Sequence, residues 1–251
     1  YPNVISSMKF ERIMNASGPF QGMIVRPSDR STPEKIAFIQ CVGSRDIKCG
    51  NGYCSSVCCM YATKEAIIAK EHADTVKPTI FFMDMRAYGK DFDKYIIRAK
   101  EEYGVRFVRS RISNVEEVPE TQDLTIKYED ERGKLIEEEF NLVVLSVGLS
   151  PPKGIVELAD RLGVELNEYG FCKTEEFEPL KTSRDGIFVC GAFQGPKDIP
   201  ESVMQASGAA AEASLFISSR TVTEKEYPPE IDVRGQEPRI GVFICRCGVN
   251  I

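Results

Sequence analysis

The spacing of apolar residues through the middle of the chain predicts alternating strands and helices. Short apolar runs of strand length occupy 36–40, 79–85 and 105–109. Between them, 55–73 and 91–102 have the periodicity of helices with one partly apolar face. This β-α-β-α-β order implies parallel strands that are joined by right-handed crossovers.

The pattern changes from helical to alternating farther along the chain. Apolar and polar residues alternate over 124–128 and again from Leu135, on either side of a polar turn at 131–133. Such alternation is typical of half-buried antiparallel strands. We therefore expect a β-meander that ends in a buried strand over 142–147, which the glycine and prolines of 148–152 terminate.

The flanking segments have weaker patterns. A short helix is expected over 7–15, and 202–216 reads as a helix rich in alanine. Residues 220–239 are polar, contain two prolines and lack an apolar period, so we expect a linker there. An apolar strand begins again at Ile240. Because neither end carries a start or stop signal, we expect an internal piece of a longer protein.

Composition excludes several classes of protein. The chain has 251 residues, of which 42% are hydrophobic and 28% charged, with a net charge of −6. No apolar run approaches the ~20 residues of a membrane-spanning helix. No block of lysine or arginine is present, which disfavours a nucleic-acid partner. We expect a cytoplasmic protein without a membrane span.

Cysteine is the residue type that changes this picture. The chain has nine cysteines, an odd count, and five of them fall within 41–60. Cys58 and Cys59 are adjacent, and neighbouring residues rarely reach disulfide geometry. Clustered thiols in a cytosolic α/β protein are more typical of metal ligands or redox groups than of a disulfide framework.

The spacing within this cluster favours an iron–sulfur site without excluding others. Cys41 ends the first predicted strand, and Cys54, Cys58 and Cys59 lie near the start of the following helix. The resulting Cys-x12-Cys-x3-Cys-Cys pattern lacks the Cys-x2-Cys pairs of most structural zinc sites. A zinc-stabilised interaction domain, and a thiol-based redox enzyme that uses Cys58 and Cys59, stay open as alternatives. Cys49 is a spare between two glycines.

The remaining candidate residues are less telling. Cys172 and Cys190 stand singly in strand-like contexts, where buried cysteine behaves as a small apolar residue. His72, the only histidine, is expected near a helix end as a surface or dipole-compensating residue. The turn after 36–40 has one glycine in Cys41-Val42-Gly43-Ser44-Arg45, so it lacks the Gly-x-Gly-x-x-Gly that a nicotinamide cofactor needs.

Several long motifs resemble those of a known family. They read FIQCVGSRD, YCSSVCCMYATKEA, DMRAYGKDFD, GVRFVRSR and KDIPESVMQASGAAA. Together they resemble the A subunits of heterodisulfide reductases, an iron–sulfur flavoprotein family that is related to methanogenesis. The resemblance covers nearly all of residues 5–217. It implies an α/β, thioredoxin-reductase-like fold, which is a partial two-dinucleotide-binding flavoprotein with a parallel βαβ sheet and a β-meander.

The resemblance also implies a domain organisation. Residues 182–193 of this chain resemble a late strand of such proteins, in which the backbone passes the flavin. The expected parts are 1–35 as part of the FAD-binding domain, 36–148 as a nucleotide-binding-like domain with the cysteine cluster, 149–219 as the remainder of the FAD-binding domain, 220–239 as a linker, and 240–251 as the start of a following module.

The family's cofactors map onto particular residues of this chain. A [4Fe-4S] cluster is implied at Cys41, Cys54, Cys58 and Cys59, which leaves Cys49 outside. Part of an FAD site is implied at Gly191, Lys197, Asp198 and Ile199. Lys197 reads equally well as a flavin-side cation or as a solvated loop lysine. Since residues 1–40 lack the Gly-rich FAD fingerprint, this piece alone is expected to bind FAD weakly or not at all, and to be inactive.

The implied function is electron transfer between FAD and [4Fe-4S] clusters, extending in this family to flavin-based electron bifurcation. The chain would be an oxidoreductase subunit, with no catalytic side chain of its own. Its implied partners are the other subunits of a heterodisulfide-reductase-type complex and hydrogenase or ferredoxin-like electron donors. A homodimer is a further assembly to test.

Overall fold

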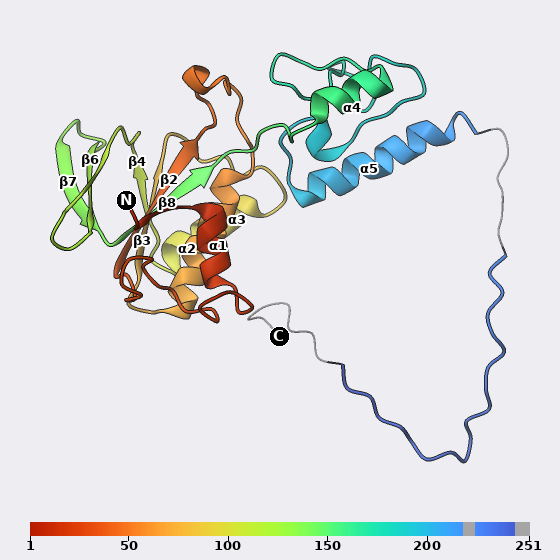
Figure 1. Cartoon of the computed structure of the whole chain (residues 1–251), viewed down its shortest axis with the longest axis horizontal. Coiled ribbons are helices and arrows are strands. Elements are labelled where there is room, and N and C mark those ends of the chain that lie inside the picture. Colours follow the sequence, from red (N-terminus) through yellow and green to blue (C-terminus); the bar gives the residue numbers. More distant parts are fainter. Residues whose placement is uncertain (218–223, 244–251) are drawn as a thin grey trace.

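A computed structural model describes residues 1–217 and 224–243 of the chain (Figure 1). Its strands are β1 (Val4–Ser6), β2 (Lys35–Val42), β3 (Lys77–Phe82), β4 (Arg106–Arg109), β5 (Val115–Glu117), β6 (Leu124–Glu129), β7 (Leu135–Phe140) and β8 (Leu142–Val147). Its α-helices are α1 (Ser7–Met14), α2 (Cys58–His72), α3 (Phe92–Glu101), α4 (Ile155–Leu162) and α5 (Ile199–Ser214). Two short 3-10 helices, η1 and η2, span Ile47–Cys49 and Gly191–Phe193.

A five-stranded parallel sheet is the centre of the fold. Its strand order is β1-β8-β2-β3-β4, and every neighbouring pair is parallel. The expected β-α-β-α-β order is thereby confirmed, with α2 and α3 as the crossover helices. β1 and α1 add a strand and a helix at the β8 edge. β1, which lies in the part expected to belong to the FAD-binding domain, thus joins the same sheet as β2, β3, β4 and β8.

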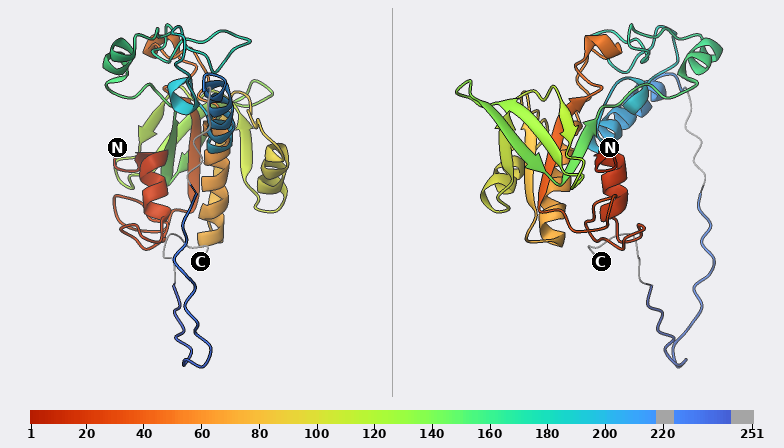
Figure 2. Two further views of the ribbon diagram at one scale, coloured as in Figure 1. Left: turned by 90° about the vertical axis from the view of Figure 1, so that its right-hand side faces the viewer. Right: turned by 60° about the vertical axis from the view of Figure 1, so that its left-hand side comes forward.

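Different layers cover the two faces of this sheet (Figure 2). The helices α1, α2 and α3 pack on one face, where Phe38 and Val144 are buried among their side chains. The predicted β-meander is the three-stranded antiparallel sheet β5-β6-β7, which packs on the other face against Phe81 and Val143. Because both faces are covered, the central strands read as continuous apolar runs in the sequence.

The carboxyl end of β2 is irregular. Its pairing with β8 shifts register between Ile39 and Val42, which is a β-bulge. Within the bulge Cys41 has a φ of 62°, and Gly43 follows with a φ of 67°. An extra residue bends a strand locally and re-aims its side chains. The bulge therefore ends β2 at the edge of the sheet and starts the cysteine-rich segment there.

Residues 149–217 form a smaller body beside the carboxyl edge of the sheet (Figure 1). Its apolar core contains Ala159 of α4 together with Val164, Cys172 and Val189. The strand expected over 182–193 is not formed; that segment has one isolated bridge, from Lys181 to Phe188, followed by η2. A strand needs a paired neighbour, and none of the described residues provides one beyond this bridge.

The last described segment, 224–243, contains no helix or strand, and its residues are exposed. The strand expected from Ile240 is absent over 240–243, and Cys245 and Cys247 lie outside the described residues. In the two described ranges, no helix combines the length and apolar character needed to cross a membrane.

Candidate redox site

The cysteine loop, which we define as residues 41–57, joins β2 to α2 at the carboxyl edge of the parallel sheet. This edge is where open α/β sheets place their ligands. The loop contains three non-glycine residues with positive φ, namely Cys41, Arg45 and Ser56. Strained backbone of this kind persists only where surrounding contacts fix it, and it concentrates at functional sites.

Hydrogen bonds inside the cysteine loop fix its shape. The Ser44 hydroxyl donates to the Tyr53 carbonyl at 3.1 Å and accepts from the backbone N–H of Ser55 at 3.0 Å. The Ser55 hydroxyl in turn accepts from the backbone N–H of Leu149 at 2.8 Å. Both serines are buried. The loop is therefore a folded unit that is tied to Leu149, two residues after the end of β8.

A tyrosine on the loop connects it to the smaller body. The Tyr53 hydroxyl donates to the Leu149 carbonyl at 2.8 Å. Its ring makes edge-to-face contacts with Tyr169, 4.9 Å between ring centroids, and with Phe171, at 5.4 Å. These contacts hold the body formed by 149–217 against the cysteine loop.

The structure brings together the four cysteines that the sequence proposed as ligands. Each of Cys41, Cys54, Cys58 and Cys59 interacts electrostatically with the other three. Cys58 and Cys59 begin α2 and are each 6% exposed. All seven cysteines of the described residues are free thiols.

The other described cysteines lie apart from this group. Cys49 is exposed on the outer part of the loop, where its thiol donates to the Asp46 carboxylate at 3.5 Å. Cys172 is buried in the core of the smaller body. Cys190 lines a cleft that is described below.

Backbone N–H groups point at two of the four sulfurs. The N–H of Ser56 donates to Cys54 Sγ at 3.3 Å, and the N–H of Arg86 donates to Cys59 Sγ at 3.4 Å. Such bonds stabilise negative charge on ligating sulfur. Among residues 1–217 and 224–243, no three His, Cys, Asp or Glu side chains converge closely enough for a single metal ion.

Burial raises the pKa of three of the four thiols when no metal is bound. It raises the pKa of Cys58 to about 12 and also raises the pKa of Cys59. Burial raises the pKa of Cys41 as well, while the Arg45 guanidinium opposes that rise. A nucleophilic cysteine needs a lowered pKa. The raised pKa values of Cys41, Cys58 and Cys59 therefore disfavour thiol-based redox chemistry at this site.

Charged residues from the turn after β3 reach the same site. Arg45 Nη1 lies 2.6 Å from Asp84 Oδ1, and Arg86 Nε lies 3.2 Å from the same oxygen. Both arginines are mostly buried, with side chains 25% and 32% exposed. Asp84 thus holds two cations beside the four thiols.

A cleft of about 760 Å³ lies between the start of α2 and the start of α5. On one side it is lined by Ser56, Val57, Met60 and Tyr61, which belong to the cysteine loop and α2. On the other side it is lined by all four residues proposed for FAD: Gly191, Lys197, Asp198 and Ile199. One cleft therefore separates the two predicted sites.

The residues on the far wall have defined local roles. Gly191 has a φ of 63°, a conformation that L-residues rarely adopt, and its N–H donates to Gln205 Oε1 at 2.8 Å. Asp198 caps α5 by accepting from the N–H of Glu201 at 2.8 Å, and the Glu201 carboxylate accepts from the N–H of Asp198 at 3.1 Å. Lys197 is half-buried and forms no ion pair with any described residue, and Ile199 is 81% exposed.

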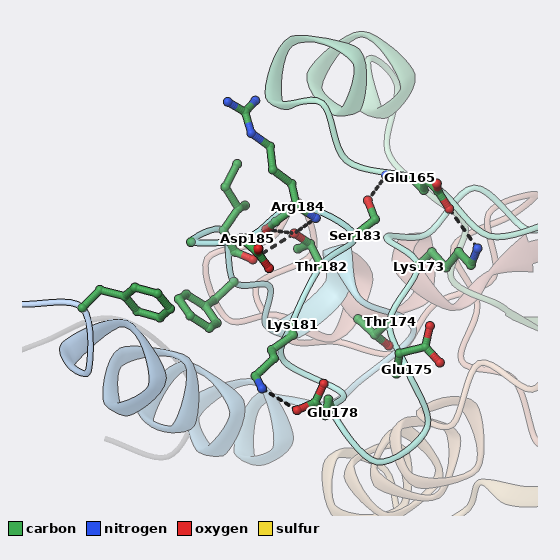
Figure 3. A pocket seen from close by; sticks show the side chains of 14 residues that line it. Glu165, Lys173, Thr174, Glu175, Glu178, Lys181, Thr182, Ser183, Arg184 and Asp185 are labelled. Carbon is green, nitrogen blue, oxygen red and sulfur yellow. Dashed lines mark hydrogen bonds and ion pairs between the residues drawn. The ribbon is translucent and has the colours of Figure 1, made fainter.

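A second hollow, of about 440 Å³, lies in the smaller body (Figure 3). Its two lysines form ion pairs with nearby carboxylates. Lys173 pairs with Glu165 at 2.8 Å, and Lys181 pairs with Glu178. The Arg184 guanidinium donates to the Leu162 carbonyl at 2.5 Å. These cations are occupied within the protein, and the residues that line the hollow include none of the cysteine loop.

Two kinds of site residue were missed at the level of sequence. Tyr61 lines the cleft and donates its hydroxyl to the Val147 carbonyl at 2.6 Å. Asp84 and Arg86 approach the thiols from a segment more than twenty residues away. The position of Asp84 near the end of the strand predicted over 79–85, at the edge where the cysteine loop also begins, was the available signal.

Comparison with known proteins agrees with this architecture. Residues 32–213 match the model of the pyridine nucleotide-disulphide oxidoreductase family. Thioredoxin reductase from T. acidophilum superposes with a TM-score of 0.52 at 14% identity, covering 84% of this chain and 57% of that chain. The thioredoxin-reductase-like fold expected from the sequence is thus confirmed.

Comparison with sequence relatives points to a narrower group of proteins than the family model does. The chain is 45% identical, over 92% of its length, to one of the iron-sulfur A subunits of CoB–CoM heterodisulfide reductase in Methanopyrus kandleri, and 46% identical, over 86%, to the corresponding protein of Methanocaldococcus jannaschii. It covers 36% and 33% of those proteins, about a third of their length. The chain belongs to the pyridine nucleotide-disulphide oxidoreductase family and, within it, is similar to the A subunits of heterodisulfide reductases.

Proposed function

We propose that this chain transfers electrons between an FAD and one [4Fe-4S] cluster within a heterodisulfide-reductase-type complex. Cys41, Cys54, Cys58 and Cys59 would hold the cluster. Gly191, Lys197, Asp198 and Ile199 would line part of the flavin site. When bound, a flavin exchanges electrons in pairs or singly, whereas a [4Fe-4S] cluster carries them one at a time.

The observation that carries this proposal is the shared cleft. Ser56, Val57, Met60 and Tyr61, the chain neighbours of Cys58 and Cys59, line one wall, and the proposed flavin residues line the other. A cofactor in the cleft would contact the segment that contains two of the proposed cluster ligands. Direct electron transfer needs this proximity, and no side chain in between has to react.

The residues around the thiols fit a cluster. Four thiols from one loop and one helix start supply the ligand set. The N–H groups of Ser56 and Arg86 supply hydrogen bonds to sulfur. The buried Ser44 and Ser55 keep the loop closed on the side of β8 and limit the access of water.

The residues on the opposite wall fit a flavin. Gly191 allows the backbone to approach a ligand closely, since it has no Cβ. Asp198 and Glu201 fix the start of α5, whose N–H groups and dipole favour an anionic or electron-rich group. Lys197 is half-buried on this wall of the cleft. A cation at this position would stabilise a reduced flavin, which supports the assignment of Lys197 as a flavin-side cation.

The alternatives fit these observations less well. Most structural zinc sites use Cys-x2-Cys pairs, and the spacing of Cys41, Cys54, Cys58 and Cys59 lacks such pairs. Burial and a raised pKa disfavour Cys58 and Cys59 as the nucleophiles of a thiol-based redox enzyme.

We extend the proposal to the setting of the protein. The partners would be the other subunits of the complex and a hydrogenase or ferredoxin-like donor, in the cytoplasm. Two of the relatives are named as heterodisulfide and ferredoxin reductase subunits of Methanococcus maripaludis and Methanothermobacter thermautotrophicus. Flavin-based bifurcation and a homodimeric assembly belong to the same proposal and are tested on the assembled complex.

The experiment is a cofactor analysis of anaerobically purified protein. We expect about four irons and four sulfides per chain at this site, with broad visible absorption and a signal in electron paramagnetic resonance after reduction. Serine variants of Cys41, Cys54, Cys58 and Cys59 should each lose this signal. Matched Cys49→Ser and Cys172→Ser variants should keep it. Colourless protein with stoichiometric zinc would refute the proposal.

A further inference from the structure

We infer that Arg45, Asp84 and Arg86 form a charge network that sets the reduction potential of the centre held by the four cysteines. This inference rests on the proposed function. It adds residues that lie outside the cysteine motif and gives them a redox-tuning role.

The network has a defined geometry. Asp84 follows β3, and its Oδ1 accepts from Arg45 Nη1 at 2.6 Å and from Arg86 Nε at 3.2 Å. Arg45 belongs to the cysteine loop and Arg86 to the turn after β3, so the carboxylate joins two segments that are far apart in the sequence. Two cations share one anion, which leaves a net charge of +1.

The network touches the thiols at three points. The charge of Arg45 acts on Cys41. The charge of Arg86 interacts with Cys54. The backbone of the same segment closes around Cys59, whose Sγ accepts from the Arg86 N–H and lies 3.9 Å from the Asp84 carbonyl oxygen.

Packing of the core does not account for the position of these arginines. Both follow the carboxyl ends of their strands, outside the apolar clusters on the two faces of the sheet. Arg45 also has a φ of 56°, in the left-handed region. Strained backbone of this kind persists where surrounding contacts fix it and clusters at functional sites. Here the side chain reaches the carboxylate that also holds Arg86.

Electrostatics gives the direction of the effect. A cluster with four thiolates is anionic and gains another negative charge on reduction. A cation nearby stabilises the reduced state more than the oxidised state, and partial burial weakens the screening by water. The two arginines therefore raise the reduction potential, and the Asp84 carboxylate lowers it.

The test is a redox titration of the full protein, followed by electron paramagnetic resonance. Arg86→Gln and Arg45→Gln should lower the ratio of reduced to oxidised cluster at a fixed potential about tenfold, equivalent to about 59 mV for one electron. Asp84→Asn should shift the potential in the opposite direction. Arg86→Lys and Arg45→Lys, which keep the charge, should stay near the wild-type potential.

A matched control is available on α3. Arg98 forms an ion pair with Glu102 at 3.1 Å, and its charge acts on Tyr103 and Glu71 rather than on a cysteine. Arg98→Gln should therefore leave the potential unchanged. Iron and sulfide content and the melting temperature of each variant, measured with and without cluster, separate changes in potential from changes in folding.

The outcomes distinguish the inference from the function on which it rests. Wild-type protein without an iron–sulfur signal would overturn the proposed function. A wild-type cluster whose potential is the same in Arg86→Gln and Asp84→Asn would overturn only the charge network. Loss of the cluster in all three neutral variants, or shifts of one sign in all of them, would assign these residues a structural role and would also overturn the inference.

Discussion

Gly148 shows how closely single residues pack around the cysteine loop. A methyl group at this position would stand 2.6 Å from Ser55 Oγ and 2.8 Å from Ser44 Cβ. Both serines are buried and hydrogen-bonded, so neither side chain has room to move. Only glycine lets the chain leave β8 while the loop stays closed.

Replacing Gly148 with alanine should therefore destabilise the protein and loosen the loop. We expect a loss of about 1–3 kcal/mol in the free energy of unfolding, the usual effect of overpacking, together with a lower iron content. Denaturant unfolding measures the first and metal analysis the second. Gly195→Ala is the control, because a methyl group there meets nothing within 4 Å. Equal effects of the two variants would contradict the proposed close packing.

Glu65 is a buried acid that forms no ion pair with the residues that the structure describes. It lies on α2 and is 3% exposed, and its Oε2 has no hydrogen-bond partner among the described residues. Burial, with a smaller contribution from Glu11, raises the pKa of Glu65 to about 9 from an ordinary value of 4.5. The side chain is therefore protonated in the folded protein at neutral pH, whereas it is ionised in the unfolded chain.

This difference gives a signed pH dependence. Between pH 4.5 and about 9 the folded state binds one more proton than the unfolded state. Stability should therefore fall as pH rises through this range, by up to ~1.4 kcal/mol per pH unit. Glu65→Gln should remove this slope, so the variant should gain stability over the wild type as pH rises. Denaturant unfolding at pH 5, 6, 7 and 8 measures this slope. Glu71→Gln, on the exposed side of α2, is the control.

At the scale of elements, α5 depends on its first turn. None of its residues is buried, so packing contributes little to its stability. The reciprocal hydrogen bonds of Asp198 and Glu201 form a capping box, with Pro200 inside the first turn. The helix that carries one wall of the cleft is thus held largely by its N-terminal cap.

Removing the cap should open the start of this helix. Asp198→Ala should cost about 1 kcal/mol, which corresponds to roughly fivefold faster amide exchange in the first turn of α5. Asp198→Asn keeps a capping side chain and should behave like the wild type. Hydrogen exchange resolved along the chain measures both. Unchanged exchange in Asp198→Ala would show that other contacts hold the helix.

Elements with a strong local pattern were predictable from the sequence, and those that depend on distant partners were not. The helices over 91–102 and 55–73 formed within a few residues of expectation, as did β8. β1 was not identified as a separate strand, because its three residues become one only by pairing with Val143–Leu145 of β8. The strand expected over 182–193 does not form, because the described residues offer it no partner strand beyond one bridge. The start of α5 does carry a local signal, the Asp-x-x-Glu capping box of Asp198 and Glu201.

The site divides in the same way. The cysteine spacing singled out four thiols that interact electrostatically with one another in the structure, because they come from a single loop and the helix that follows it. The contribution of Asp84 and Arg86 required the parallel pairing of β2 with β3, which a single sequence does not state. The positive φ of Cys41 was equally hidden, because glycine, not cysteine, normally marks such positions.

At the scale of the whole molecule, the cysteine loop is the turn between the central strand β2 and helix α2. In related folds the first βα turn carries a glycine-rich motif at a helix N-terminus. Here the turn is folded back through Ser44 and Ser55, and α2 begins with two cysteines. Although its family is named for pyridine nucleotides, this chain lacks the Gly-x-Gly-x-x-Gly motif after β2.

Reduced nicotinamide cofactors should therefore not bind at this edge. We expect no saturable binding of NADH or NADPH by calorimetry up to millimolar concentration, in protein with its cluster and in protein without it. A control titration with a related thioredoxin reductase establishes the sensitivity of the assay. Binding that Ser44→Ala or Ser55→Ala weakened would contradict the assignment.

The bulge at the end of β2 has a consequence for comparing this chain with its relatives. Side chains on a strand alternate between its two faces, so one additional residue reverses the face of every residue that follows. The bulge is thus equivalent to a one-residue insertion near Cys41. Structure-based alignment with dinucleotide-binding members of the family should place a single gap there, and deleting Gln40 should turn the Cys41 thiol away from its three partners while the sheet is retained.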